Sequence, residues 1–241
     1  MDLQGKTVIV TGASAGIGDA TARAFYAAGS NVVLASRNEA ALARLAKQLG
    51  EDRTLVVRTD VTQRDQVENL IDRTVERFGR LDILINNAGV GLMGSVADFD
   101  PEAFEQLFRV NMMGPLYGMQ AAVRAMRKTG GGMIVNISSG TSRMVLPNLG
   151  GGYPALKRAL EVLSDYARAQ LVNDKIKVLV VLPYITETKF RENALGRRPT
   201  SAGHEQFRRD LPQGHSAEFV AEKIIDAIRK EETEISLAPA R

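Results

Sequence analysis

The chain has 241 residues, of which 44% are hydrophobic and 24% are charged, with a net charge of +3 and no cysteine. A chain of this length buries roughly 70–75% of its unfolded surface, which is ample for one core, and doubly wound α/β domains commonly reach this size undivided. The lack of cysteine excludes disulfides and thiolate metal sites, and the small, dispersed charge does not favour binding to nucleic acid.

The sequence also lacks the features of membrane and exported proteins. No apolar run approaches the ~18 residues of a membrane helix. Asp2 and Gln4 interrupt the start of the chain, and the apolar core at 6–10 is far too short, so we expect no signal peptide. We therefore expect a cytoplasmic protein that does not bind membranes.

Short apolar runs alternate with amphipathic patterns of helical period along the whole chain. In chain order, we expect strands at 6–12, 31–36, 54–60, 81–89, 132–139, 176–183 and 234–239, and helices at 17–29, 38–50, 62–79, 101–128, 153–172 and 216–230. Asn38 is placed to cap the second helix, and Gly50 to end it. Continuous apolar strands between helices indicate a doubly wound α/β fold, with a parallel sheet of about seven strands covered on both faces.

Two local patterns point to chemistry. Residues 11–18 read TGASAGIG, a glycine-rich turn between a strand and a helix, which is typical of dinucleotide pyrophosphate sites. Tyr153 and Lys157 lie four residues apart, on one face of a helix. An ammonium beside a phenol lowers the pKa of that phenol and makes it a general acid/base. A solvated surface pair is the alternative interpretation. Pro154 places Tyr153 at the N-terminal edge of its helix.

These motifs occur in a recognisable order. TGASAGIG is followed by Asp60-Val61, NNAG at 86–89, Asn111 within a helix, Ser138-Ser139, YPALK at 153–157 and PYITET at 183–188. In this order the chain resembles the short-chain dehydrogenase/reductase family. The resemblance implies a single NAD(P)-binding Rossmann domain over residues 1–241, and an oxidoreductase that interconverts a carbonyl and a secondary alcohol.

The resemblance also implies a cofactor site. The residues it assigns to the nicotinamide dinucleotide are Gly12, Ser14, Ala15, Gly16, Ile17, Gly18, Ser36, Arg37, Asp60, Val61, Asn87, Ala88, Gly89, Tyr153, Lys157, Pro183, Thr186 and Thr188. An NAD site has an acidic residue after the second strand, whereas this chain has Ser36 and Arg37, which suit a 2′-phosphate. We therefore expect NADP(H), although relatives that prefer NADP often carry a basic residue at position 15.

The catalytic set implied by the resemblance is Asn111, Ser139, Tyr153 and Lys157. Because successive strand residues face opposite ways, only one of Ser138 and Ser139 can serve, and Ser139 matches the motif; Ser142 is a further candidate. Pro115 has no amide hydrogen, so the Asn111 carbonyl loses its helical partner and becomes available for a proton relay. Asn86 is expected to be a structural hydrogen-bonding residue.

The region after the sixth strand departs from the family. Tyr184 stands where the family has glycine, and it either narrows the substrate pocket, stacks on the substrate or packs in the core. The segment 186–215 is long enough to be a lid. Its arginines (191, 197, 198, 208, 209) suit either a solvated loop, which we favour, or an anionic substrate. His204 and His215 are interpreted as surface residues, because no metal spacing is present. We expect the apolar pocket to be completed by Leu92, Met93, Met144, Val145 and Leu146.

The sequence thus predicts an NADP(H)-dependent reductase of an apolar ketone that uses no metal. The alternatives are an NAD-dependent alcohol dehydrogenase of the same fold and a regulatory protein that binds NADP(H) without catalysis. The family commonly packs the helices at 101–128 and 153–172 into a four-helix bundle between subunits, so we expect a homodimer or homotetramer.

Overall fold

The computed structural model describes residues 1–145, 150–196 and 214–237. Within these ranges the strands form one parallel sheet in the order β3-β2-β1-β4-β5-β6-β7. The strands are β1 (Thr7–Thr11), β2 (Asn31–Ser36), β3 (Thr54–Arg58), β4 (Ile83–Asn86), β5 (Gly132–Ile137), β6 (Ile176–Leu182) and β7 (Glu234–Ser236). The doubly wound Rossmann fold expected from the sequence is confirmed.

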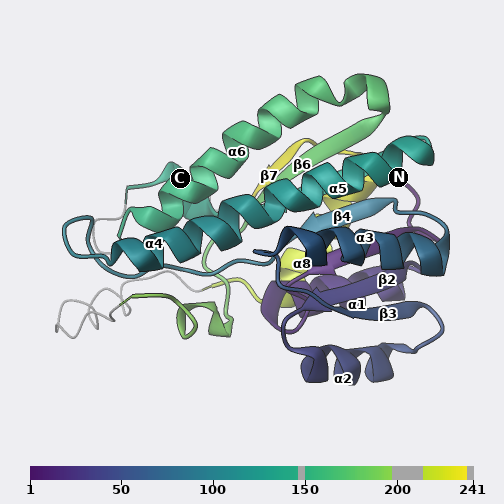
Figure 1. Cartoon of the computed structure of the whole chain (residues 1–241), viewed down its shortest axis with the longest axis horizontal. Coiled ribbons are helices and arrows are strands. Elements are labelled where there is room, and N and C mark those ends of the chain that lie inside the picture. Colours follow the sequence, from purple (N-terminus) through teal and green to yellow (C-terminus); the bar gives the residue numbers. More distant parts are fainter. Residues whose placement is uncertain (146–149, 197–213, 238–241) are drawn as a thin grey trace.

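Helices cover both faces of this sheet (Figure 1). They are α1 (Gly16–Ala27), α2 (Glu39–Leu49), α3 (Arg64–Phe78), α4 (Pro101–Phe108), α5 (Gly114–Lys128), α6 (Gly152–Gln170) and α8 (Ala217–Lys230). Alternate strand residues enter separate cores, as the two-residue period of a strand requires. Val8 and Val10 pack with α1, α2 and α8, whereas Ile9 packs with α3 and α5.

The ends of the second helix follow the sequence signals. The Asn38 side chain accepts a hydrogen bond from the Ala41 amide and caps α2, and Gly50 ends the helix with φ 126°. The third helix begins two residues later than expected, at Arg64. Helix α6, expected at 153–172, ends at Gln170 and is followed by a 3₁₀ turn, η4 (Val172–Asp174).

The long helix expected at 101–128 is interrupted in the middle. Between α4 and α5 lies a π-helical turn, η1 (Arg109–Met113), and the Gly114 amide donates to the Arg109 carbonyl five residues earlier. Pro115 has no amide hydrogen to continue the α-helical ladder, which accounts for the wider turn at this point. Such π-turns occur frequently at functional sites, and this one contains Asn111.

Loops at the carboxyl ends of the strands gather at one edge of the sheet, the edge at which such folds bind ligands. The chain after β6 runs across this edge: the Leu195 amide donates to the Gly91 carbonyl, and the Met93 amide donates to the Leu195 carbonyl. The expected lid at 186–215 is described only up to residue 196 and from residue 214 onward. None of the described helices combines the length and apolar character needed to cross a membrane.

Candidate active site

The glycine-rich loop joins β1 to the N-terminus of α1. Gly12 has φ +69°, a conformation that favours glycine, and a Cβ at this position would lie 3.0 Å from the Ala88 backbone. A Cβ on Gly18 would overlap the Gly12 carbonyl. The remaining residues that the sequence assigned to this loop, Ser14, Ala15, Gly16 and Ile17, form the turn and the start of α1, with Ala15 as the N-cap. The α1 amides are thus presented at a close-packed backbone turn.

The second strand ends beside this loop. The Ala13 amide donates to the Ala35 carbonyl at 3.2 Å, which fixes the loop to the end of β2. The Ser36 hydroxyl accepts from the Asn38 amide at 3.1 Å. Arg37 is exposed, and within the described part of the chain its guanidinium has no ion-pair partner. A guanidinium at this position is available to an anionic ligand.

The fourth strand ends on the other side of the loop. Asn87 Nδ2 donates to the Thr11 carbonyl at 2.8 Å, and the Asn87 and Ala88 amides both donate to the Thr11 hydroxyl. Asn86 instead points inward and donates to Asn136 Oδ1 at 2.9 Å, which confirms its expected structural role. Asn87 and Ala88 therefore form one wall of the loop region.

Asp60 and Val61 follow the third strand. Asp60 Oδ1 accepts hydrogen bonds from the Thr62 amide and hydroxyl at 3.0 and 2.8 Å. The Val61 side chain packs against Gly114 at the start of α5. Val61 and Ala88 line one small cavity at this point, so the structure brings these two predicted cofactor residues together.

Tyr153 is the second residue of α6, at the N-terminal edge that Pro154 predicts. Ser139 follows β5, and its hydroxyl lies 2.8 Å from the Thr141 hydroxyl. The Ser139 side chain is close enough to Tyr153 to lower the pKa of the phenol. The Ser138 hydroxyl points away and donates to Glu161 at 2.6 Å. The Ser142 hydroxyl also lies at Glu161. The strand alternation therefore places Ser139, of the three serines, at the phenol.

Lys157 lies one helical turn after Tyr153. Its Nζ is 5.6 Å from the centre of the Tyr153 ring and donates to the Ile137 carbonyl at 2.8 Å. A Cβ on Gly89 would lie 2.8 Å from Asn111 Oδ1 and 3.6 Å from Lys157 Nζ, so both polar atoms lie next to Gly89 and a larger residue there would crowd them. The four predicted catalytic residues thus meet around Gly89 and the end of β5.

The Asn111 side chain is fully buried in the π-turn. Its Nδ2 donates to the Val90 and Leu107 carbonyls at 3.0 and 3.1 Å. Its Oδ1 is buried with no hydrogen-bond partner among the described residues. Buried polar atoms are normally paired, so this acceptor, beside Lys157, is available to a donor.

The expected effect of Lys157 on Tyr153 is corrected by the structure. Burial raises the pKa of Tyr153 well above its usual value, and the nearby Ser139 side chain only partly opposes this. Phe190 is one of the side chains packed beside it, with ring centres 5.5 Å apart. Burial also lowers the pKa of Lys157 to about 8, against the attraction of Glu161. The phenol is therefore in its neutral, proton-donating form.

The segment after β6 contributes the remaining predicted residues. The Pro183 carbonyl accepts from the Gly140 amide at 2.7 Å, and the Tyr184 ring lies against Gly140, next to Ser139. The Thr186 hydroxyl donates to the Tyr184 carbonyl at 3.2 Å. The Thr188 methyl lies over Gly16 in the glycine-rich loop. This segment therefore connects the catalytic side chains to the predicted pyrophosphate site.

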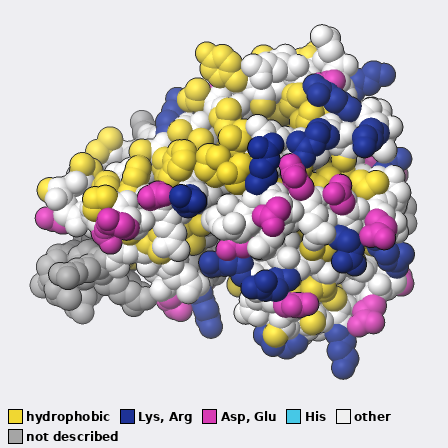
Figure 2. All heavy atoms as spheres, viewed as in Figure 1, with side chains coloured by type: hydrophobic (Ala, Val, Ile, Leu, Met, Phe, Trp, Pro, Cys, Tyr) yellow, Lys and Arg dark blue, Asp and Glu magenta, His cyan; other side chains and the backbone are white. Residues whose placement is uncertain are grey.

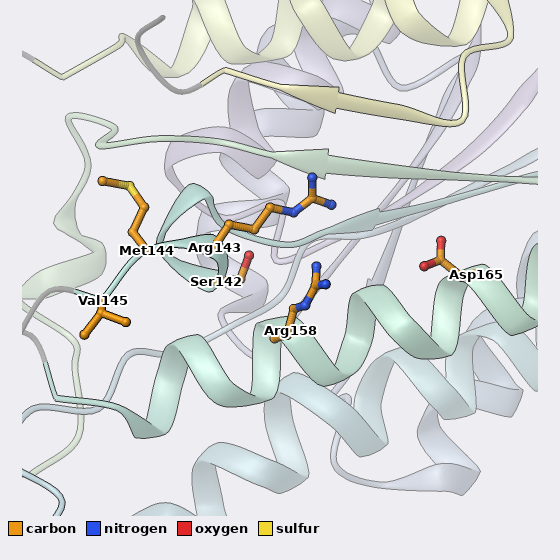
Figure 3. Close-up of a pocket in the computed structure, with 6 residues that line it drawn as sticks. All are labelled: Ser142, Arg143, Met144, Val145, Arg158 and Asp165. Carbon is orange, nitrogen blue, oxygen red and sulfur yellow. The ribbon is translucent and has the colours of Figure 1, made fainter. Parts of the chain in front are cut away.

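The apolar pocket differs from the expectation. Leu92 packs with Leu107 and Leu156, and Tyr153 and Leu195 pack against this cluster. The structure does not bring Met144 and Val145 to it, because the 3₁₀ turn η2 (Gly140–Arg143) leads the chain outward. These two residues line a separate groove of about 590 Å³ with Ser142, Arg143, Arg158 and Asp165 (Figure 3), and Val145 is 92% exposed. Leu146 lies outside the described residues.

Two neighbours of the site had no sequence prediction: Glu161, which is buried behind the serines, and Phe190. Glu161 stands four residues after Lys157, a spacing that is more often an ordinary surface ion pair. His215 stacks on Phe219 and lies 2.9 Å from the Leu237 carbonyl, in a structural position. His204 and the arginines at 197, 198, 208 and 209 lie outside the described residues. Among the described residues, no cluster of three potential metal ligands is found.

Comparison with known proteins shows the family of the chain. The family model for short chain dehydrogenase matches residues 6–198. An uncharacterized oxidoreductase from Staphylococcus saprophyticus is 35% identical over 191 residues, which are 78% of this chain and 81% of that protein. The chain therefore belongs to the short-chain dehydrogenase/reductase family and is an oxidoreductase.

Two solved structures are similar over nearly the whole chain. A short-chain dehydrogenase/reductase from Burkholderia phymatum in complex with NAD has a TM-score of 0.89 and 29% identity, and the match covers 99% of this chain and 91% of that one. The 3-ketoacyl-(acyl-carrier-protein) reductase from Brucella melitensis, complexed with NADH, has a TM-score of 0.87 and 25% identity, with 98% and 97% covered. Both neighbours bind a nicotinamide dinucleotide.

Proposed function

We propose that the chain is an NADP(H)-dependent oxidoreductase that interconverts a ketone and a secondary alcohol. The observation that carries this proposal is the convergence of Ser139, Tyr153, Lys157 and Asn111 beside the glycine-rich loop. A protein that only senses the nucleotide needs no tyrosine placed between a serine and a buried lysine. The catalytic set therefore favours an enzyme over the regulatory alternative.

The residues present fit a dinucleotide. Side chains are excluded at Gly12 and Gly18 by the backbone around them, which keeps the N-terminus of α1 accessible to a phosphate. Arg37 and Ser36 would hold a 2′-phosphate, and Lys157 would hold the nicotinamide ribose. When bound, the cofactor supplies or accepts the hydride, and the protein supplies position and field.

The side chains divide the proton chemistry among them. In the reducing direction Tyr153 donates its proton to the substrate oxygen, and Ser139 donates a hydrogen bond to the same oxygen. Tyr153 is protonated at neutral pH, as a phenol normally is, and can donate this proton. Because burial raises its pKa, the phenolate that forms needs stabilisation from its neighbours. Lys157, with a pKa of about 8, stabilises the phenolate that remains. The Asn111 carbonyl, opposite Pro115, would connect Lys157 to solvent through water.

An NAD-dependent alcohol dehydrogenase is the second candidate, because both neighbours described above are bound to NAD or NADH. The deciding experiment is turnover of a panel of carbonyls and secondary alcohols with each of the four cofactor forms. We expect NADPH-dependent reduction to be the fastest. Faster turnover with NAD(H) would favour the second candidate, and no turnover with any pair would favour the regulatory one.

Phe190 and Tyr184 are expected to limit the size of the substrate. The Phe190 ring covers Tyr153 and also contacts the position where a Gly91 side chain would stand. Phe190→Ala should therefore raise kcat/KM for a bulky ketone relative to a small one by about 10-fold. The measurement is the ratio of the two kcat/KM values in variant and wild type.

Tyr184→Gly tests the second ring in the same way, since Tyr184 lies against Gly140. We expect the same direction of change. A ratio that stays at the wild-type value in this variant would assign Tyr184 to core packing. Phe78→Leu, on α3 away from the site, is the matched control for loss of an aromatic ring.

The apolar surface of the long helices supports a dimer. Hydrophobic side chains gather over the region of α4, α5 and α6 (Figure 2), where Phe108, Val162 and Tyr166 are 40%, 46% and 65% exposed. Exposed apolar patches of this kind mark interfaces. Light scattering at micromolar concentration is expected to show at least a dimer. Val162→Asp should shift the protein toward monomer, whereas Val75→Asp on α3 should not. A wild-type protein that is only monomeric would contradict this assembly.

A further inference from the structure

Glu161 lies on α6 one helical turn after Lys157 and two turns after Tyr153. Its side chain is only 3% exposed. A carboxylate is rarely buried to this extent unless it is paired and hydrogen-bonded. The partners of Glu161 therefore indicate what the residue does.

Four side chains donate to this carboxylate, from the residue after β5, from η2 and from α6. The Ser138 hydroxyl donates at 2.6 Å and the Ser142 hydroxyl also contacts it. Arg143 Nε lies at 3.1 Å and Arg158 at 2.7 Å. Figure 3 shows Arg143 on η2 and Arg158 on α6 pointing into the space between these two elements. Burial disfavours the charged form, but these donors outweigh it and lower the pKa of Glu161.

The side chains that contact Glu161 lie next to Ser139 in the sequence and also next to Lys157 on α6. Ser138 directly precedes Ser139, and the Ser142 hydroxyl lies 2.6 Å from the Ser139 carbonyl. The Ser138 hydroxyl also lies 3.3 Å from the Lys157 carbonyl. One buried carboxylate thus connects the loop that carries Ser139 to the helix that carries Tyr153 and Lys157.

We propose that Glu161 is a positioning residue for this active site, which holds the Ser139 loop on α6. Because it places a buried negative charge one helical turn after Lys157, it also acts on the Lys157 ammonium through space. The proposal rests on the proposed function, since it assigns Ser139, Tyr153 and Lys157 the catalytic roles. Glu161 acts through these residues and takes no part in the transfer of proton or hydride.

The charged and titratable groups around Lys157 and Glu161 determine the direction in which a substitution at Glu161 changes the pKa of Lys157. Tyr153 and Arg158 face these two residues from α6, and Arg143 faces them from η2. Arg143 is also paired with Glu234 on β7. The elements β5 and η1 contribute the Ile137 carbonyl and the Asn111 amide. Glu161 supports the charge on Lys157 against burial, and Arg158 partly neutralises Glu161.

The direct test is the titration of Lys157 by NMR, using lysine labelled with ¹³C at Cε, with the signal assigned by its loss in Lys157→Met. In Glu161→Gln, which keeps the shape of the side chain, the pKa of Lys157 should fall by about one unit. In Arg158→Gln it should rise, because Glu161 is then less neutralised. Asp165→Asn, one turn further along α6 at a position 63% exposed, is the matched control and should leave the pKa unchanged.

Kinetics give the second readout. The alkaline fall of kcat/KM should move to lower pH in Glu161→Gln and to higher pH in Arg158→Gln, whereas a simple packing defect lowers activity without opposite shifts. A Lys157 pKa that is the same in wild type and Glu161→Gln would overturn the proposal. If Glu161→Gln does not fold, an unchanged pKa in Arg158→Gln overturns it. Lack of turnover in the wild type would refute the proposed function and leave the titration result intact.

Discussion

Tyr153→Phe is expected to lower turnover by roughly 100-fold or more while the dissociation constant for NADPH stays close to that of the wild type. The substitution keeps the ring that packs against Phe190 and removes only the hydroxyl. That hydroxyl carries the proton that we propose is donated to the substrate oxygen, so its loss removes the acid. The measurements are kcat on the best ketone and the fluorescence titration of NADPH.

Two further variants distinguish loss of the proton donor from loss of a neighbouring charge and from loss of a tyrosine hydroxyl elsewhere. Lys157→Ala should impair both turnover and NADPH binding, because in the proposed function the same ammonium stabilises the phenolate and would hold the nicotinamide ribose. Tyr26→Phe removes a hydroxyl that hydrogen-bonds Asp52 on the surface of α1 and α2, and it should change neither quantity. Near-normal turnover of Tyr153→Phe would mean that the acid lies elsewhere.

The fold was predictable from the sequence because its signals are local. Apolar strands such as β1 and β6 alternate with amphipathic helices, and Asn38 and Gly50 determine the ends of α2 through their own backbone and side-chain chemistry. Pro115 indicated an irregularity in the helix at 101–128, because it has no amide hydrogen. The π-turn itself was not predictable, because it depends on the packing around Asn111.

The positions of the catalytic side chains were also largely predictable. The choice of Ser139 over Ser138 follows from the alternation of a strand, and Pro154 accounts for the place of Tyr153. The raised pKa of Tyr153 was not predictable, because it depends on burial of the side chain by segments that are distant in the sequence, such as the one that carries Phe190.

The surroundings of Glu161, and the groove lined by Met144 and Val145, could not be predicted from the sequence either. The spacing between Lys157 and Glu161 is visible in the sequence, but burial by Ser138, Ser142 and Arg143 is a property of the η2 turn. That turn also carries Met144 and Val145 away from the Leu92 cluster to which they had been assigned. Loop directions of this kind depend on tertiary packing and have no periodic signal in the sequence.

Arg37 is expected to set the cofactor preference. It is exposed directly after β2, and Ser36 beside it is held by the Asn38 amide. Loss of a charge-assisted contact to the 2′-phosphate costs about 1.5–3 kcal/mol, or roughly 10- to 150-fold in affinity. Arg37→Ala should therefore weaken NADPH binding by this factor and leave NADH binding nearly unchanged, because NADH has no 2′-phosphate.

The test is the pair of dissociation constants, for NADPH and NADH, in wild type and variant. Arg44→Ala removes an exposed guanidinium from α2, seven residues further along the chain, and serves as the matched control for net charge. It should affect the two cofactors equally and only slightly, as a screened surface charge does. The preference for NADPH should also fall as salt is raised, since the contact is between exposed charges. Equal affinities of the wild type for NADPH and NADH would reject the role of Arg37 and favour the NAD-dependent dehydrogenase.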